Sequence, residues 1–425
     1  MRIAVIGSGI AGLASAWWLD GAHEVTLFEA NDYLGGHTHT HALQVDGIPM
    51  AVDTGFIVFN PQHYPLLSAL FDELGVESQP TTMSFSMRSE RSGVEYNATS
   101  LDGLFCQRRN LLSPRFWGML RDLRRFYRDA PALLDGDAGP TLGEYLRSQR
   151  YGEAFIEEHL LPMASALWSS PTATVRDFPA RYLVQFMANH QMLQVSGRPQ
   201  WRVVKGGSAR YIEALRARWQ VRERLECAVW KVEREADGAW VHSAAGVEGF
   251  DEVIMACHSD QALRLLDDAD PLEQQILGAI NYQHNDVVLH TDASLLPRRR
   301  KAWAAWNAHV PDATDAPCTV SYCMNLLQGL PGDTPLVVTL NDSARIDPAK
   351  VLRRMRYAHP VHDHAAVAAQ QRWADIQGQR HTWFAGAYWG WGFHEDGIRS
   401  ARRVVDALTA RRPNAFWLPQ PEATA

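Results

Sequence analysis

The chain has 425 residues, of which 46% are hydrophobic and 21% charged, and its formal net charge is −7. This composition is typical of a globular protein that is too long for one simple core, so we expect two lobes. No apolar run reaches the roughly 18 residues that a membrane-spanning helix needs, and the net acidity argues against nucleic acid as a partner.

The cysteines and the amino-terminal segment indicate the compartment. The five cysteines are odd in number and form no CxxC pair, which predicts reduced thiols. The first expected strand begins at residue 2, which leaves no room for a signal peptide. We therefore expect a cytoplasmic protein.

The first expected elements are a strand over residues 2–6, a glycine-rich turn and a helix over about 13–19. Gly7, Gly9 and Gly12 have the spacing G-x-G-x-x-G directly after the strand. Gly7 permits a tight turn, Gly9 lets the backbone approach a pyrophosphate, and Gly12 brings the helix close to the strand.

A second strand is expected over residues 24–28, and it ends at an acid. Glu29 stands twenty residues after Gly9, where a carboxylate accepts hydrogen bonds from an adenosine ribose. A carboxylate would repel the 2′-phosphate of NADP. The βαβ pattern therefore predicts a site for an adenine dinucleotide, either NAD or FAD.

The next residues resemble the flavin amine oxidase superfamily, which includes phytoene desaturases and protoporphyrinogen oxidases. The resemblance rests on Gly35-Gly36-His37-Thr38 and on Asp53-Thr54-Gly55-Phe56. It implies that the Gly-Gly backbone reaches the pyrophosphate and flavin, and that the second segment lines the isoalloxazine. His37 stands where the family usually has arginine. His37, His39 and His41 otherwise predict an edge strand with surface imidazoles and no metal site, because alternate residues on one strand do not converge on one ion.

Two later segments extend the resemblance. Residues 226–256 predict a strand meander, and the resemblance implies that Val229 holds the adenine through its backbone. Residues 382–398 resemble the closing Phe-Ala-Gly-Glu…Gly-Tyr-x-x-Gly motif, with Ala387 in place of the acid. We expect a helix to begin at Gly397 and to point its positive end at the flavin. No cysteine lies in this motif, so FAD should be non-covalent.

Motif and resemblance together give the expected cofactor-binding residues. They are Gly7, Gly9, Ile10, Ala11, Gly12, Glu29, Ala30, Gly35, Gly36, His37, Thr38, Thr54, Gly55, Phe56, Val229, Gly386, Phe393, Glu395, Asp396, Gly397 and Ile398.

The motif positions predict an α/β fold with an α+β second lobe and a discontinuous domain organisation. A Rossmann-like FAD-binding domain of the glutathione-reductase type is expected over residues 1–85, 200–265 and 375–425. The substrate domain should comprise a helical part, 86–199, and an antiparallel-sheet part, 266–374. Only one dinucleotide fingerprint is present, so we expect two-electron oxidation of an organic substrate, with hydride transfer to flavin N5. Dioxygen or an external acceptor would reoxidise the flavin.

The substrate is open between two classes. Many amine-oxidising relatives keep a lysine over N5 and two aromatic rings that frame the amine. Phe393 matches one ring position, and Trp389 or Trp391 would supply another face of an aromatic pocket, which suits an apolar molecule. No lysine aligns with the N5 position, and Lys301 belongs to a basic segment, 298–301, that we expect to be a solvated loop.

The acid–base residue is also open. His394 could move a proton as catalytic residue. Alternatively, Glu395 and Asp396 cap a helix and His394 orients a backbone carbonyl.

A basic helix, expected over about residues 113–129, raises the question of whether the protein contacts a membrane. Ser113-Pro114 predicts a helix start, and the helix should run to about residue 129. Residues 108–129 contain seven arginines and two aspartates, a local charge of +5. The helix over Arg115–Asp129 either lies on an anionic membrane, at the inner face, or buries its apolar face in the lobe with its arginines in water.

A narrower resemblance links the chain to amine-oxidase-like FAD proteins that accompany bacterial cyclopropane fatty-acid synthases. Residues 52–60 and 392–397 carry it. It implies a role in lipid metabolism with a lipid acyl chain as substrate. The alternatives are an amine oxidase, or a non-catalytic FAD-binding partner of a lipid-modifying enzyme.

Overall fold

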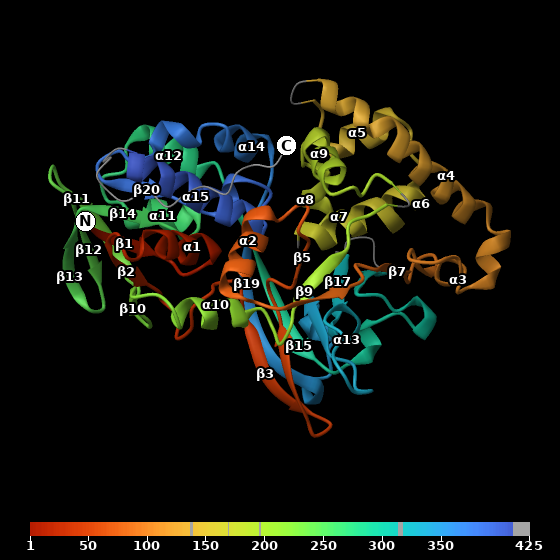
Figure 1. Cartoon of the computed structure of the whole chain (residues 1–425). Coiled ribbons are helices and arrows are strands. Elements are labelled where there is room, and N and C mark those ends of the chain that lie inside the picture. The colour runs from red at the N-terminus through yellow and green to blue at the C-terminus, as the bar shows by residue number, and fades with distance from the viewer. Residues whose placement is uncertain (137–138, 169, 195–196, 313–317, 411–425) are drawn as a thin grey trace. The chain divides into compact units, whose positions relative to one another are not determined.

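The computed structural model describes residues 1–136, 139–168, 170–194, 197–312 and 318–410. The chain divides into two compact units (Figure 1). Unit 1 comprises Met1–Gly36, Tyr211–Ala279 and the described residues from Ala369 onward, and unit 2 comprises His37–Arg210 and Ile280–Ala368. Residues 411–425 of the predicted third FAD-binding segment lie outside the described residues.

Unit 1 is built on a five-stranded parallel sheet with the strand order β10-β2-β1-β14-β20. Its strands are β1 (Arg2–Ile6), β2 (Glu24–Phe28), β10 (Arg222–Arg224), β14 (Glu252–Met255) and β20 (Thr382–Phe384). Ile3, Ala4 and Val5 of the central strand are fully buried, as expected for a parallel sheet that is covered on both faces.

The other elements of unit 1 complete the predicted Rossmann-like fold. The meander is the antiparallel sheet β11 (Val229–Arg234), β12 (Ala239–Ser243) and β13 (Gly246–Phe250). The helices are α1 (Ile10–Leu19), α11 (Ser259–Leu265), α12 (Pro271–Gly278), η8 (Trp373–Ile376), η9 (Ala387–Trp389) and α15 (His394–Ala410). Two helices, α10 (Ala209–Arg216) and α14 (His364–Gln370), cross the boundaries between the units.

Unit 2 contains a seven-stranded sheet with the order β19-β15-β18-β17-β16-β7-β8. Its strands are β7 (Phe85–Ser89), β8 (Glu95–Asn97), β15 (Tyr282–His290), β16 (Trp306–Val310), β17 (Thr319–Cys323), β18 (Val337–Leu340) and β19 (Val351–Pro360). The strands of residues 266–374 pair antiparallel with one another, as predicted. The whole sheet is mixed, because β16 pairs with β7 in parallel. The segment 86–199 is mainly helical but begins with β7 and β8.

The helices of unit 2 include a group, over residues 114–189, that lies apart from the strands β15 and β19 of its large sheet (Figure 1). The helices of unit 2 are α2 (Pro65–Leu74), α3 (Leu101–Leu104), η1 (Arg108–Leu112), α4 (Pro114–Asp129), η2 (Ala130–Asp135), α5 (Leu142–Ser148), α6 (Glu153–Phe155), η3 (Ile156–Leu160), α7 (Leu161–Trp168), α8 (Thr172–Arg176), α9 (Ala180–Asn189), η4 (Ala293–Leu295), η5 (Arg300–Ala302), α13 (Met324–Leu327), η6 (Ser343–Arg345) and η7 (Pro348–Lys350). The predicted start of α4 is confirmed, since the Ser113 hydroxyl accepts a hydrogen bond from the Phe116 N–H at 3.2 Å.

Two small sheets belong to unit 2. β3 (Thr40–Val45) pairs with β4 (Ile48–Asp53), and β9 (Trp201–Val204) pairs with both β5 (Val58–Phe59) and β6 (Ser78–Thr81). These pairings place residues 37–85 and 200–210 in unit 2, whereas the motif-based division assigns them to the FAD-binding domain. The unit to which a segment belongs depends on which strands it pairs with, and the sequence motifs carry no information on that pairing.

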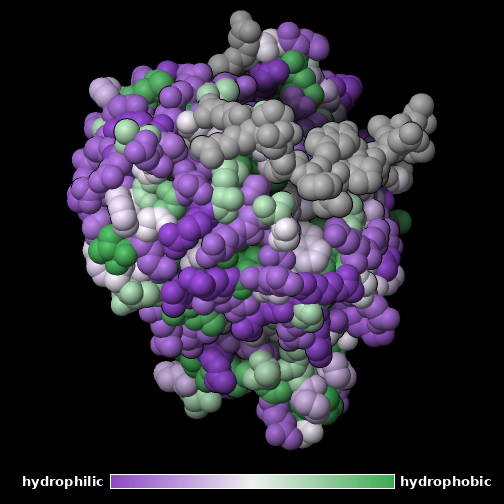
Figure 2. Space-filling model, turned by 60° about the vertical axis from the view of Figure 1, so that its left-hand side comes forward, coloured by the Kyte–Doolittle hydropathy of each residue, from purple (hydrophilic) through white to green (hydrophobic). Residues whose placement is uncertain are grey.

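Among the described residues, no helix combines the length and apolar character that crossing a bilayer requires. On the face drawn in Figure 2, hydrophobic side chains lie in small separate groups among hydrophilic ones.

Candidate cofactor and active site

The glycine-rich turn after β1 is closed to side chains at two positions. Gly7 has a φ of +102°, and a Cβ there would lie 2.9 Å from the carbonyl oxygen of Ala256. A Cβ on Gly12 would lie only 1.9 Å from the carbonyl oxygen of Gly7. Both glycines are therefore needed for the packing of the turn itself.

Gly9 is different, because the space around it is open. It caps the N-terminus of α1 with a φ of −62°, and a Cβ added there would meet nothing within 4 Å. The first N–H groups of α1 are directed toward this space, and with the helix dipole they favour an anionic group such as a pyrophosphate. Ile10 and Ala11 form the first turn of the helix and are buried.

Glu29 is buried at the carboxyl end of β2 and organises the neighbouring loops. Its Oε2 accepts hydrogen bonds from the backbone N–H (3.0 Å) and the hydroxyl of Ser8. Its Oε1 accepts from the backbone N–H (2.9 Å) and the side-chain amide (2.8 Å) of Asn31. Sequence reasoning missed Ser8 and Asn31, although Ser8 is the variable residue between the first two glycines. Ala30 lies beside this carboxylate and is exposed.

The Gly35-Gly36 pair lies directly against the first turn. The Gly35 N–H donates to both the carbonyl oxygen and the hydroxyl of Ser8, each at 3.0 Å. Gly36 has a φ of +56°, and its Cβ would lie 3.2 Å from the Cα of Gly9. The two glycine segments therefore form one backbone-lined surface within unit 1.

The start of β11 runs beside Glu29. The N–H of Cys227 donates to the carbonyl oxygen of Glu29 at 2.8 Å, and the N–H of Glu226 donates to Asn31 at 2.9 Å. Val229 follows at the first position of β11, where the register of the pairing with β12 shifts. The expected adenine-binding backbone of Val229 thus lies two residues after Cys227, which contacts the acid that is expected to bind the ribose.

The closing segment differs from the prediction in one respect. The helix begins at His394 and not at Gly397, so His394, Glu395 and Asp396 form its first turn. Asp396 Oδ2 accepts hydrogen bonds from the N–H groups of Trp391 and Phe393, each at 3.1 Å. Asp396 therefore caps the turn before α15, and burial raises its pKa to about 6.

Contacts of α15 with α1 bring the first and last motifs together. A Cβ on Gly397 would lie 2.7 Å from Cγ2 of Ile10, so glycine is needed for this close approach. Ile398, the next residue, is fully buried. The N–H of Gly386 donates to the Ser400 hydroxyl at 2.6 Å, which fixes the turn after β20 to the same helix.

The aromatic residues of the closing segment have unequal environments. Trp389 is 8% exposed, and its indole N–H donates to the carbonyl oxygen of Phe384 at 3.1 Å. This contact gives Trp389 a structural role inside the loop. Trp391 and Phe393 are half-buried, and their place in a substrate pocket stays a prediction.

His394 is half-buried, and this desolvation lowers its pKa to about 3. The imidazole is therefore neutral at physiological pH, and so low a pKa makes it a weak proton acceptor. Glu395 beside it is 3% exposed.

Unit 2 brings together the expected segments around His37 and Thr54. The N–H of Phe56 donates to the carbonyl oxygen of His37 at 2.8 Å, and the N–H of Thr54 donates to His39 at 3.1 Å. A Cβ on Gly55 would lie 2.0 Å from the same His37 oxygen. Thr38 and Phe56 are buried.

The expectation of surface imidazoles is wrong. His37, His39 and His41 are all half-buried, because they pack on one another and on strand β19. The rings of His39 and His41 lie 4.1 Å apart, and His37 lies 5.0 Å from the ring of Tyr357. Among the described residues, no group of three or more His, Cys, Asp or Glu is arranged to hold a metal ion.

Comparisons with known proteins decide the family. The model of the family of flavin-containing amine oxidoreductases matches residues 10–291, which hold Gly12 of the glycine-rich turn, Glu29, the Gly-Gly pair and Val229. The chain belongs to this family. Membership implies FAD as cofactor.

Similar proteins include a Mycobacterium tuberculosis protein that is provisionally named flavin-containing monoamine oxidase AofH. It is 29% identical over 266 residues, which are 60% of this chain and 56% of that protein. The chain thus spans about half the length of the curated relatives that it matches. Cyclohexylamine oxidase from Brevibacterium oxydans has a TM-score of 0.69 at 16% identity, over 97% of this chain and 99% of its own. A fatty acid isomerase from P. acnes has a TM-score of 0.63 at 16% identity, over 97% and 98%. These two structures show the fold.

The described residues fit the FAD of a flavin-containing amine oxidoreductase. The open space at Gly9 would accommodate a pyrophosphate, and the Glu29 carboxylate would accept hydrogen bonds from a ribose.

One polar contact of this family member was missed by sequence reasoning. Asp53 is fully buried in unit 2, and it accepts hydrogen bonds from Ser208 and from the Gln328 side chain (2.8 Å). Ser208 follows Gly206-Gly207 at the start of α10. Two features of the sequence could have revealed this contact. Asp53 stands in the motif that carried the resemblance, and Gly206-Gly207-Ser208 predicts the start of a helix, where a carboxylate is favoured.

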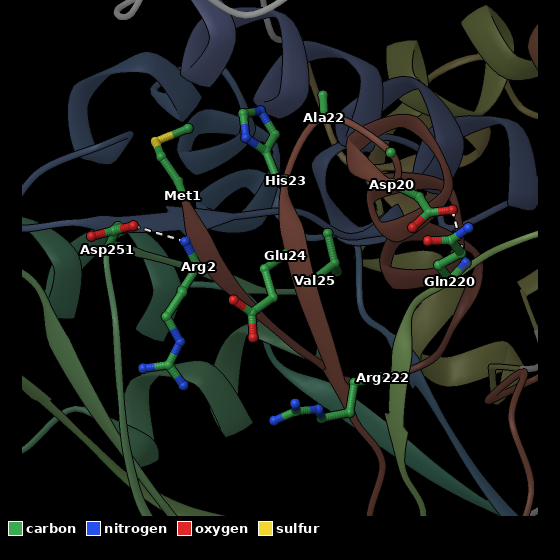
Figure 3. A pocket seen from close by; sticks show the side chains of 11 residues that line it. Met1, Arg2, Asp20, Ala22, His23, Glu24, Val25, Gln220, Arg222 and Asp251 are labelled. Carbon is green, nitrogen blue, oxygen red and sulfur yellow. Dashed lines mark hydrogen bonds between the residues drawn. The ribbon is translucent and has the colours of Figure 1, made fainter.

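A groove of unit 1 lies at the other end of its parallel sheet (Figure 3). Arg2, Glu24 and Arg222, at the amino ends of three strands, line it together with His23 and Asp251. Cofactors of doubly wound sheets bind at the carboxyl ends of the strands. This groove is therefore separate from the candidate FAD site.

Proposed function

We propose that this chain is a FAD-dependent oxidoreductase that removes two electrons, as a hydride, from an apolar substrate of the lipid acyl type. FAD supplies the hydride acceptor when it is bound, and dioxygen or an external acceptor takes the electrons afterwards. The residues of unit 1 around Gly9, Glu29 and Gly36 bind the ADP half. The half-buried Trp391 and Phe393 offer apolar surface beside the start of α15.

We prefer an apolar substrate over an amine because of where the lysines of this chain lie. The chain has four lysines, and each pairs with a carboxylate at 3.3 Å or less: Lys205 with Glu77, Lys231 with Asp267, Lys301 with Asp102 and Lys350 with Asp292. Each of these lysines is at least 30% exposed. An N5 lysine, which amine-oxidising relatives keep, would instead need a site within the active centre.

Amine oxidation is the second candidate, and the 29% identity to a flavin-containing monoamine oxidase supports it. The third is a non-catalytic FAD-binding partner of a lipid-modifying enzyme. In each case the protein would act at the cytoplasmic face of a membrane or in the cytoplasm.

Anaerobic flavin spectroscopy separates the three. The FAD-loaded protein is mixed without oxygen with phospholipid extracts, with free fatty acids, or with a panel of primary amines and polyamines. Bleaching by lipids alone supports the proposal. Bleaching by an amine, with peroxide and ammonia formed in air, would establish the oxidase. Bleaching by neither, with a lipid-modifying enzyme co-purifying, would leave the binding role.

A further inference from the structure

Exposed hydrophobic side chains are concentrated at one corner of unit 2. Leu112 is 88% exposed, Leu101 76%, Trp117 50% and Leu111 46%. All four lie between residues 101 and 117, in α3, η1 and the first turn of α4 (Figure 1). We call these four residues the apolar corner.

The apolar corner is held in place by specific contacts. The indole N–H of Trp117 donates to the carbonyl oxygen of Leu111 at 2.9 Å. The ring of Phe105, which is buried, lies 5.6 Å from the ring of Trp117. The exposed leucines therefore project from a fixed turn.

Basic side chains from two distant segments surround the apolar corner. Arg108, Arg109 and Arg115 lie in the same segment as the apolar corner and are exposed. Arg108 also pairs with Asp102 at 2.6 Å and Arg115 with Glu158 at 2.5 Å. The exposed basic loop Arg298–Lys301 lies beside α3, because Lys301 Nζ bonds Asp102 Oδ2 at 3.1 Å. Its backbone is fixed as well, since the Arg298 N–H donates to the Glu95 carboxylate at 2.9 Å.

The apolar face of α4 cannot serve the same purpose. Phe116, Met119 and Phe126 are 3%, 2% and 0% exposed, so this face is packed in the core of unit 2. A contact of the Arg115–Asp129 helix with a membrane would therefore involve its start and not its apolar face.

We propose that the apolar corner docks on the surface of a membrane that contains anionic phospholipids. The leucines and Trp117 enter the boundary between headgroups and acyl chains, where indole rings are favoured. The basic residues around them contact the anionic headgroups. The positive surface lies on a chain of net charge −7, so charge complementarity favours this lipid class over a neutral one. This surface is independent of the redox reaction.

The test is sedimentation of the FAD-loaded full chain with vesicles of phosphatidylcholine alone, or of phosphatidylcholine with phosphatidylglycerol. Two variants remove one property each: Leu112→Glu, and the double substitution Arg298→Gln with Arg299→Gln. Matched controls are Leu326→Glu, at a residue 48% exposed on α13, and Arg354→Gln with Arg356→Gln on β19, where both arginines are exposed. All these side chains point into water, so the fold should tolerate each change.

We expect binding to the anionic vesicles and a loss of binding in added salt. The double arginine variant should bind roughly 25-fold more weakly, since each basic residue near the lipid is worth about fivefold. Leu112→Glu should weaken binding about tenfold or more, and both controls should bind like the unchanged protein. Equal binding by neutral vesicles, or equal binding by the variants and controls, would overturn the proposal. If Leu112→Glu has a smaller molecular mass in solution than the unchanged protein, yet binds vesicles equally well, the apolar corner would instead be a site of self-association.

Discussion

The carboxylate of Asp53 accepts hydrogen bonds from the backbone N–H (2.9 and 3.0 Å) and the hydroxyl (2.8 Å) of Ser208, 155 residues later in the chain. This contact joins the end of β4 to the residue before α10. The hydroxyl of Thr40 and the amide of Gln328 also donate to Asp53, so the buried carboxylate has several donors. It therefore positions the Thr54-Gly55-Phe56 segment, which the resemblance places beside the flavin.

Burial raises the pKa of Asp53 to about 6 from its usual 3.8. The folded state thus binds a proton between about pH 4 and pH 6 that the unfolded state releases, and the free energy of unfolding falls as pH rises through this window. Asp53→Asn does not titrate. We expect its stability relative to the unchanged protein to rise by about 2 kcal/mol from pH 4 to pH 6. Urea unfolding at several pH values, followed by near-UV circular dichroism, measures the difference, and a flat difference would contradict the assignment.

Substitution by alanine should weaken FAD binding at Gly9 but destabilise the fold at Gly12. Gly9→Ala places a Cβ in open space at a φ that alanine adopts, so the free energy of unfolding of the apoprotein should change by less than about 0.5 kcal/mol. The same methyl group blocks the approach of a pyrophosphate, and FAD affinity should fall about 100-fold or more. Gly12→Ala collides with the Gly7 carbonyl and should destabilise the apoprotein itself. Chemical unfolding and FAD titration together separate the two effects.

Removing the acid after β2 should weaken FAD binding, both directly and through the loops of Ser8 and Asn31 that it organises. Glu29→Ala removes the ribose acceptor and should lower FAD affinity roughly 10- to 100-fold, as expected for loss of charged hydrogen bonds. The control is Glu24→Ala, since Glu24 is exposed at the opposite end of the same strand. Equilibrium titration with flavin fluorescence gives both affinities. Equal affinities would place the adenosine elsewhere.

The neutral imidazole of His394 should be detectable by nitrogen NMR spectroscopy. With a folded pKa of about 3, its ring should stay neutral from about pH 5 to pH 9, although a free histidine titrates near 6.5. Nitrogen NMR spectra of histidine-labelled protein, compared with those of His394→Gln, identify its signal. Because the unfolded state binds the proton first, His394 should also reduce stability as pH falls below about 6.5. A signal that titrates near neutrality would contradict the burial.

The cofactor half of the fold could be predicted because local rules determine it. Gly7, Gly9 and Gly12 follow a buried strand, and Glu29 ends the next one, so chain order alone identifies a dinucleotide fold. The start of α4 could also be predicted from neighbouring residues, since Ser113 is a favoured N-cap residue and Pro114 a favoured first residue of a helix. The start of α15 was placed three residues late, because the sequence does not reveal that Asp396 bonds the N–H groups behind it.

The sheet of unit 2 was harder to predict. Strand β19 contains Arg353, Arg354 and Arg356 and lies at the sheet edge, where it pairs only with β15. Edge strands tolerate charge, so the alternating apolar pattern is lost. The parallel pairing of β16 with β7 joins segments more than 200 residues apart, and neither sequence carries a signal for the other. The histidines near His37 were misplaced for the same reason, since their partners lie on β19.

The central strand of unit 1 pairs with β14, about 250 residues later, and α1 packs on α15, which begins at His394. During synthesis on the ribosome, the glycine turn emerges long before the elements that support it. Such long-range contacts close slowly. We therefore expect loading of the flavin nucleotide to wait until α15 has left the exit tunnel, so nascent chains arrested before that point should not retain it.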